Sequence, residues 1–335
     1  MVFLLQKTLV YTVPLLIVAL AGMYAERSGI INIALDGIMV FGAFVGAFGA
    51  TLLRKTPFFV DHSQVTFLLS MLIASAAGAL FSLLLSFSAI KLKADQTIGG
   101  TALNMIAPAL SLFIIKLTFH KDELEMARSM GSDGQYHDFG YVILNDKLGS
   151  VGSVFFDKMY ISTYIAIAVF IILSILIYKP RFGLRLMACG EHPQAADSVG
   201  INVCRMRYIG TTVSGALAGL GGYIYIATVA NGTASGAVAG MGFLALAIMI
   251  FGNWKPLGIA FGALLFGFLK CLGVIYDQIF LTIGGEKVYF LKDLNMPMYF
   301  YNIIPYIAVL VVLAFTSKKS RAPKAEGIPY DKGAR

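Results

Sequence analysis

Long apolar runs fill most of this 335-residue chain, and each contains at most one charged residue. Because a helix needs about 20 apolar residues to cross a bilayer, runs of this kind predict transmembrane helices. There are nine, at residues 5–24, 29–52, 66–90, 97–118, 160–178, 207–230, 239–252, 257–276 and 299–316. The seventh is too short to span comfortably, which indicates a broken or re-entrant helix. The sequence therefore predicts an all-α, polytopic transmembrane helical bundle of about nine spans, within a range of eight to ten.

The composition excludes most soluble classes of protein. Hydrophobic residues make up 58% of the chain and charged residues only 13%, with a mean hydropathy of +0.79. The net charge of +8 lies in a few loops and near the C-terminus, as membrane topology requires, so it predicts no nucleic-acid partner. The three cysteines and four histidines lack the spacing of a metal site, and we predict neither catalytic residues nor a bound metal.

Basic residues set the orientation of the predicted spans. The connection 179–207 and the segment 317–335 are rich in Lys and Arg, so we expect both in the cytosol, whereas the acidic connection 119–159 suits the outside. With nine crossings, the N-terminus then lies outside and the C-terminus in the cytosol. We divide the chain into a transmembrane domain, residues 1–316, and a basic cytosolic tail, residues 317–335, which we expect to be solvated or to lie on anionic membrane lipid.

The connection 179–207 contains a short helix with a recognisable start and end. In "GLRLMACGEHPQAADSVGIN", residues 183–202, Pro193 follows His192 at the first helical position, and Gly200 supplies the stop. A turn of a few residues would join two spans, so the helix has a purpose beyond connection. From the residues alone, it is either a docking element for a partner protein or an ordinary interfacial helix.

Three polar residues fall inside predicted spans. Asn32 and Asp36 are four residues apart and share a helical face, and Asp36 lies about ten residues past Glu26, well below the interface. A charge at that depth costs at least a few kcal/mol unless it is paired, hydrated or protonated. Asp36 therefore either lines a substrate path or stabilises a broken helix. For Asn104, we favour a polar face toward the path over a hydrogen bond between helices.

The order of the spans indicates an inverted repeat. Spans one to four begin outside and spans six to nine begin inside, and each set holds a glycine-rich interrupted segment, "GIINIALDG" and "GMGFLALAIMIFGNWKPLG". Such a repeat places a substrate path near the interface between its halves. Trp254, in the second segment, is expected at the membrane edge as an interfacial anchor.

Four blocks of the sequence resemble the permease subunits of ABC importers for branched-chain amino acids, ribose and nucleosides. They are "ERSGIINIALDGIMVFGAFVGA" (26–47), "ADQTIGGTALNMIAPAL" (94–110), "KPRFGLRLMACGEHPQAADSVGINVCRMRYIGTTVSGALAGLGGYIYIA" (179–227) and "GMGFLALAIMIFGNWKPLGIAFGALLFGF" (240–268). They are most similar to the second of the two paralogous permeases in nucleoside systems. The resemblance covers about residues 10–316, and the chain departs from the family in its long connection 119–159.

The resemblance implies a transmembrane permease subunit of an importer in the bacterial inner membrane. Its partners would be a separate ABC ATPase subunit, a paralogous permease in a heterodimer, and an extracytoplasmic substrate-binding lipoprotein. The short helix would be the coupling helix that the ATPase grips, comprising Glu191, His192, Pro193, Ala195, Ala196, Asp197 and Gly200.

The absence of any Gly-Lys dipeptide excludes a Walker A phosphate loop. We therefore expect no cofactor in this chain, with ATP and Mg²⁺ bound by the partner subunit. The expected substrate is nucleoside-like, and simple sugars or riboflavin remain open. Two hypotheses of other classes are an ion-coupled secondary transporter acting alone, with Asp36 as its ion site, and a membrane scaffold.

Overall fold

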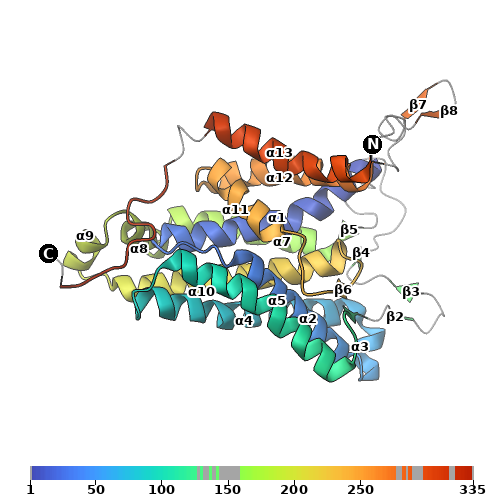
Figure 1. Ribbon diagram of the computed structural model, residues 1–335, viewed down its shortest axis with the longest axis horizontal. Coiled ribbons are helices and arrows are strands. Elements are labelled where there is room, and N and C mark those ends of the chain that lie inside the picture. Colours follow the sequence, from blue (N-terminus) through green and yellow to red (C-terminus); the bar gives the residue numbers. More distant parts are fainter. Residues whose placement is uncertain are drawn as a thin grey trace.

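The computed structural model describes residues 2–126, 129–130, 136–137, 141–142, 159–276, 281–283, 286–288, 297–316 and 321–333. Long helices lying side by side form most of the molecule (Figure 1). Its helices are α1 (Val2–Arg27), α2 (Leu35–Leu53), α3 (Pro57–Asp61), α4 (Ser63–Ile90), α5 (Gln96–Phe119), α7 (Ile161–Tyr178), α8 (Arg181–Glu191), α9 (Pro193–Ser198), α10 (Val203–Thr228), α11 (Met241–Phe251), α12 (Pro256–Val274) and α13 (Met298–Thr316).

The predicted fold class is confirmed. Within the described ranges, seven helices are long and apolar enough to cross a membrane, namely α1, α2, α4, α5, α7, α10 and α12. The shorter apolar helices are α11 and the part of α13 from Tyr299 to Val312. Each predicted segment thus contains a helix, and the seventh is short, as the sequence indicates. The protein is a polytopic helical bundle.

Short strands occur between the helices. They are β1 (Leu124–Glu125), β2 (Ser129–Met130), β3 (Tyr136–His137), β4 (Tyr141–Val142), β5 (Met159–Tyr160), β6 (Thr233–Ala234), β7 (Leu281–Ile283) and β8 (Glu286–Val288). They pair antiparallel as β1 with β6, β2 with β3, β4 with β5 and β7 with β8. The predicted outer connection 119–159 lies largely outside the described residues.

The helix packing agrees with the predicted inverted repeat. Helix α1 packs against α10, α11 and α12, whereas α10 packs against α1, α2 and α4. Likewise α2 contacts α4 and α5, and α11 contacts α12 and α13. Helices α1 and α10 run in opposite directions, because Ser28 lies against Gly210 while Val18, earlier in α1, lies against Gly221, later in α10. The first four and last four predicted spans therefore pack as two similar units of opposite orientation.

Glycines allow helices α2, α4 and α10 to cross closely. A Cβ atom on Gly42 of α2 would lie 2.3 Å from the Cα atom of Gly219 on α10. A Cβ atom on Gly219 would lie 2.3 Å from the backbone oxygen of Ala74 on α4. Such contacts leave no room for a side chain and bring three backbones together, which is how membrane helices gain packing energy without a hydrophobic effect between them.

Two local features differ from the sequence prediction. The second apolar segment is helical only from Leu35, because residues 28–34 form a non-helical break. The connection 179–207 contains two short helices rather than one, since α8 precedes α9. Helix α8 buries Gly183, Leu186 and Cys189 on one face and exposes Arg185 on the other, an amphipathic pattern with helical spacing.

Candidate functional site

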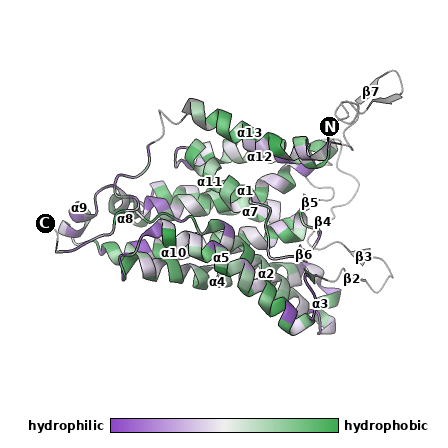
Figure 2. Ribbon diagram, viewed as in Figure 1, coloured by the Kyte–Doolittle hydropathy of each residue, from purple (hydrophilic) through white to green (hydrophobic). Residues whose placement is uncertain are grey.

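The short helix α9 lies at one end of the bundle, beside α8 and close to the C-terminal residues; we call this the α9 end (Figure 1). Figure 2 shows hydrophilic residues gathered around α8, α9 and the C-terminal segment. Pro193 occupies the first turn of α9, and the His192 Nδ1 atom accepts a hydrogen bond from the Ala195 N–H at 3.3 Å. Gly200 has a φ of +83°, the left-handed conformation that ends the segment. The predicted start and end of this helix are confirmed.

Helix α9 has one packed face and one open face. Pro193 and Ala196 are buried, and α9 packs against α8 and α10. Ala195 and Ser198 are exposed, and Val199, just past the helix, keeps 74% of its surface exposed. A helix held on one side and open on the other can transmit force from a partner protein to the helices beneath it.

The residues before α9 fix it to the first helix of the bundle. The Arg27 guanidinium, at the end of α1, lies 3.8 Å from the Glu191 carboxylate and donates a hydrogen bond of 3.0 Å to the Trp254 backbone oxygen. Burial raises the pKa of the Cys189 thiol in α8 to about 11, so this thiol stays protonated at neutral pH. Helix α8 is therefore a packed support for α9.

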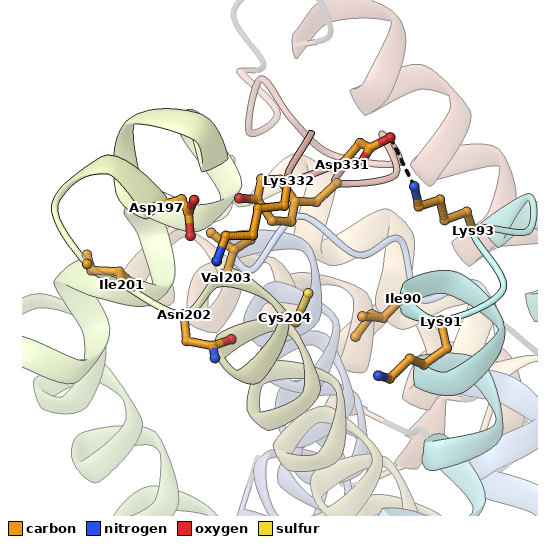
Figure 3. Close-up of a pocket in the computed structure, with 12 residues that line it drawn as sticks. Ile90, Lys91, Lys93, Asp197, Ile201, Asn202, Val203, Cys204, Asp331 and Lys332 are labelled. Carbon is orange, nitrogen blue, oxygen red and sulfur yellow. Dashed lines mark ion pairs between the residues drawn. The ribbon is translucent and has the colours of Figure 1, made fainter. Parts of the chain in front are cut away.

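Two clefts open at the α9 end of the bundle. One has a volume of about 720 Å³ and is lined by Ile90, Lys91, Lys93, Asp197, Gly200, Ile201, Asn202, Val203, Cys204, Tyr330, Asp331 and Lys332. Figure 3 shows Lys93 and Asp331 pointing toward each other at its edge, and their charged atoms are 3.1 Å apart. The other cleft has a volume of about 740 Å³ and is lined by Arg27, Glu191, Asn253, Lys255, Arg321, Ala322 and Lys324. Both clefts have mixed charge, with more basic than acidic side chains.

The predicted path residue Asn104 holds the break before α2. Its Oδ1 atom accepts a hydrogen bond from the Gly37 N–H at 2.7 Å, and its Nδ2 group donates to the Ile33 backbone oxygen at 2.9 Å. Gln96, on the same helix α5, accepts from the Ile31 N–H at 2.7 Å. Non-helical backbone at membrane depth needs such partners, because lipid supplies none.

Asp36 and Asn32 connect the same region to the second half of the bundle. The half-buried Asp36 carboxylate accepts a hydrogen bond of 2.9 Å from the Gly242 N–H in the first turn of α11. Asn32 is fully buried and donates to the Ser214 hydroxyl of α10 at 2.8 Å. Asn32, Asp36 and Asn104 therefore come together around the break and have structural partners. A role in lining a substrate path remains a prediction for all three.

Sequence reasoning missed three further polar residues of this region. Arg207, the last residue of the predicted connection 179–207 and the first of the predicted span 207–230, is 1% exposed within α10. Glu26 is 4% exposed and accepts a 2.6 Å hydrogen bond from the Trp254 Nε1–H. Trp254 is 5% exposed, so its predicted role as an interfacial anchor is wrong. A carboxylate and a tryptophan at matching ends of two spans were the available signal, and only the fold brings them together.

Across the ranges that the structure describes, no group of three or more His, Cys, Asp or Glu residues lies close enough together to hold a metal ion.

Comparison with known protein families identifies the family of this chain. Residues 4–315 match the family described as "Branched-chain amino acid transport system / permease component". The chain is a member of this family, and it is therefore a permease component that crosses the membrane several times.

Several relatives have nucleoside-related names, among them the following three. The guanosine ABC transporter permease protein NupQ of Bacillus subtilis is 39% identical over 333 residues, covering 98% of this chain and 96% of the relative. The nucleoside ABC transporter permease protein NupC of Lactococcus lactis is 36% identical, covering 97% of this chain and 95% of the relative. The nucleoside ABC transporter permease protein NupB of the same organism is 25% identical, covering 94% and 83%. No solved structure matches.

Proposed function

We propose that this chain is the transmembrane permease subunit of an ATP-driven ABC importer that forms the path for a nucleoside-like substrate. The observation that carries the proposal is α9, a capped helix with a buried inner face and an exposed outer face. The names of the relatives NupQ and NupC support both the transporter class and the substrate class.

Helix α9 is the proposed coupling helix, gripped by a separate ATPase subunit. ATP and Mg²⁺ would bind to that subunit, and this chain would catalyse no reaction. Since Pro193 and Ala196 fix α9 to its neighbours, movement of the ATPase would tilt one half of the bundle relative to the other.

We propose that the protein lies in the bacterial inner membrane and that its α9 end faces the cytosol. Basic side chains outnumber acidic ones in the loops and helix ends of this region, including Arg27, Lys91, Lys93, Lys179, Arg181, Arg185, Arg205, Lys255, Arg321, Lys324 and Lys332. The N-terminus would then lie outside and the C-terminus in the cytosol. A binding lipoprotein would deliver substrate to the opposite end.

A paralogous permease is the proposed second half of the path. The relatives NupC and NupB come from one organism, and both are similar to this chain at different levels of identity. This is the pattern expected when two permease genes descend from one ancestor, and it supports a heterodimer.

A cysteine cross-link to the ATPase tests the coupling role. Cys189, Cys204 and Cys271 would be replaced, a single cysteine introduced at the exposed Val199, and cross-linking to a co-expressed ATPase subunit followed with and without ATP. We expect a cross-link whose yield changes with nucleotide. A cysteine at Phe58, 54% exposed at the opposite end of the bundle, is the matched control and should give none.

Transport assays complete the test. Vesicles containing the permeases, the ATPase and the binding protein should take up radiolabelled guanosine when ATP is supplied, and excess ribose or riboflavin should not compete. Uptake by this chain alone in ATP-free vesicles, together with no Val199 cross-link, would overturn the proposal in favour of a secondary transporter.

A further inference from the structure

Residues 321–333, which the sequence predicts as a solvated arm, pack along the α9 end; we call them the strap. The backbone N–H of Arg321 donates to the Asn253 Oδ1 atom at 2.8 Å, in the turn between α11 and α12. The Ala325 N–H donates to the Gly190 backbone oxygen at 2.8 Å, near the end of α8. The Gly327 N–H donates to the Gly29 backbone oxygen at 3.2 Å, just after α1. The strap is therefore held by backbone contacts to three separate connections.

The far end of the strap reaches α9 itself. Tyr330 lines the same cleft as Asp197 of α9, and burial, followed by the nearby Asp197 carboxylate, raises the pKa of the Tyr330 hydroxyl. Next to it, Asp331 forms the ion pair with Lys93 in the turn between α4 and α5 (Figure 3). The strap thus contacts elements from both halves of the inverted repeat as well as α9.

Arg207 is the anchor of the strap. Its Nη1 group donates to the Ile328 backbone oxygen at 2.9 Å, and its Nη2 group lies 3.5 Å from the Ala325 backbone oxygen. In the described part of the chain, Arg207 forms no ion pair with a carboxylate. A buried guanidinium needs acceptors, so the strap supplies what its charge requires.

The junction after α1 is shaped to admit this contact. Gly29 has a φ of +94°, and a Cβ atom there would lie 2.8 Å from the Nη2 atom of Arg207 and 3.3 Å from the Ala325 backbone oxygen. Only glycine leaves room for the guanidinium to pass between the junction and the strap. Ala325 is 6% exposed, so the strap fills a packed position rather than resting on the surface.

We propose that the strap is a positioning element of the transporter: anchored on Arg207, it holds α9 to both halves of the helical bundle, so that force applied to α9 moves them. The proposal rests on the coupling role of α9 proposed above. Without the strap, α9 would keep its packing on α8 and α10. It would lose the link that the strap makes, through Gly190, Asp197 and Lys93, to the other turns at this end of the bundle.

The first experiment measures attachment of the strap in the purified permease without any ATPase. A zero-length carbodiimide cross-link should join Lys93 to Asp331 in the native chain, because their charged atoms are 3.1 Å apart. We expect Arg207→Gln to lower the yield of this cross-link by at least about fivefold, since hydrogen bonds from a charged donor are lost. Arg205→Gln removes the same charge from an exposed position two residues earlier and should leave the yield unchanged.

The second experiment measures coupling in vesicles that contain the full transporter. One variant is a chain that ends after Ala322. It also carries Arg207→Met, so that no guanidinium is left buried without acceptors. Arg207→Gln is the second variant, so the test does not depend on a single chain that could misfold. We expect both variants to assemble with the ATPase, yet to take up several-fold less substrate per ATP hydrolysed than the Arg205→Gln control.

The outcomes separate this proposal from the proposed function. Loss of the Lys93–Asp331 cross-link with unchanged uptake per ATP would overturn the positioning role and leave the permease assignment intact. A cross-link that survives Arg207→Gln would overturn the anchoring role. If the native chain shows no ATP-dependent uptake with the ATPase, the proposed function fails, and the cross-link still reports whether the strap is attached.

Discussion

Replacement of Asn104 by leucine distinguishes the two roles that its position allows. Leucine has a similar size but cannot accept from the Gly37 N–H or donate to the Ile33 oxygen, which lie 2.7 Å and 2.9 Å from the amide. Each unsatisfied buried backbone group costs about 1–3 kcal/mol in soluble proteins. A hydrogen bond between membrane helices contributes on average about 0.6 kcal/mol to stability. We therefore expect Asn104→Leu to destabilise the fold by about 2 kcal/mol, a roughly 30-fold change in the ratio of folded to unfolded protein.

The assay pairs an unfolding titration with a transport measurement. The unfolding midpoint in mixed micelles should fall for Asn104→Leu, while the KM for uptake, measured on folded protein, stays unchanged. Thr101→Val is the matched control, because Thr101 is exposed one turn earlier on α5 and its hydroxyl, among the residues that the structure describes, donates to backbone oxygens of its own helix. An unchanged midpoint together with a raised KM would refute the structural role and make Asn104 a substrate contact.

Three further predictions follow from packed or buried positions. Gly219→Ala should destabilise the fold by about 2–3 kcal/mol, because its methyl group would lie 2.3 Å from the Ala74 oxygen; an unchanged unfolding midpoint would contradict the packing. Trp254→Phe removes the hydrogen bond to Glu26 and should cost about 1–3 kcal/mol in the same titration, and an unchanged unfolding midpoint would show that this hydrogen bond does not stabilise the fold. Burial raises the pKa of Glu326 in the attached strap, so the contribution of this carboxyl to attachment is fully present below about pH 4.3 and is lost as the pH rises through the raised value. The Gly333 N–H and Lys93 lower the pKa of Asp331, so the loss of the Lys93 ion pair at acid pH runs in the opposite direction and is the same in a chain that lacks the Glu326 carboxyl. Glu326→Gln should remove the loss at rising pH, and identical pH profiles of strap hydrogen exchange in both chains would show that the carboxyl does not control attachment.

Much of the fold could be predicted because short stretches of the sequence determine where its helices lie. An apolar run of about 20 residues has few alternatives to a membrane helix, since only a helix or a closed barrel satisfies the backbone in lipid. Pro193 and Gly200 likewise define the limits of α9 through their own backbone preferences. Asp36 and Asn104 could be selected as unusual because polar side chains are rare at that depth, but the sequence could not choose between their two roles.

The strap could not be predicted, for an equally physical reason. Residues 321–333 have no apolar periodicity, and they are held mainly by their backbone groups, which every residue type carries. Arg207 is the residue that could have indicated the contact, since a buried guanidinium needs acceptors. From the sequence alone, however, a residue six positions past Ile201 can lie in either a loop or a helix. Its burial depends on where α10 begins, and the boundary of a helix is the least certain feature of a sequence pattern.

The inverted repeat relates polar contacts that otherwise look unconnected. In the first half, Asn104 on α5 ties down the non-helical segment before α2 through the Ile33 oxygen. In the second half, Tyr306 on α13, the helix that corresponds to α5, donates a 3.2 Å hydrogen bond to the Ala239 oxygen in the segment before α11. Each half thus uses its last helix to satisfy the break before its second helix, and Asp36 joins the two breaks by accepting from Gly242. Asp36 therefore links the two halves where α2 meets α11, just as Asn32 links them where the break before α2 meets Ser214 of α10.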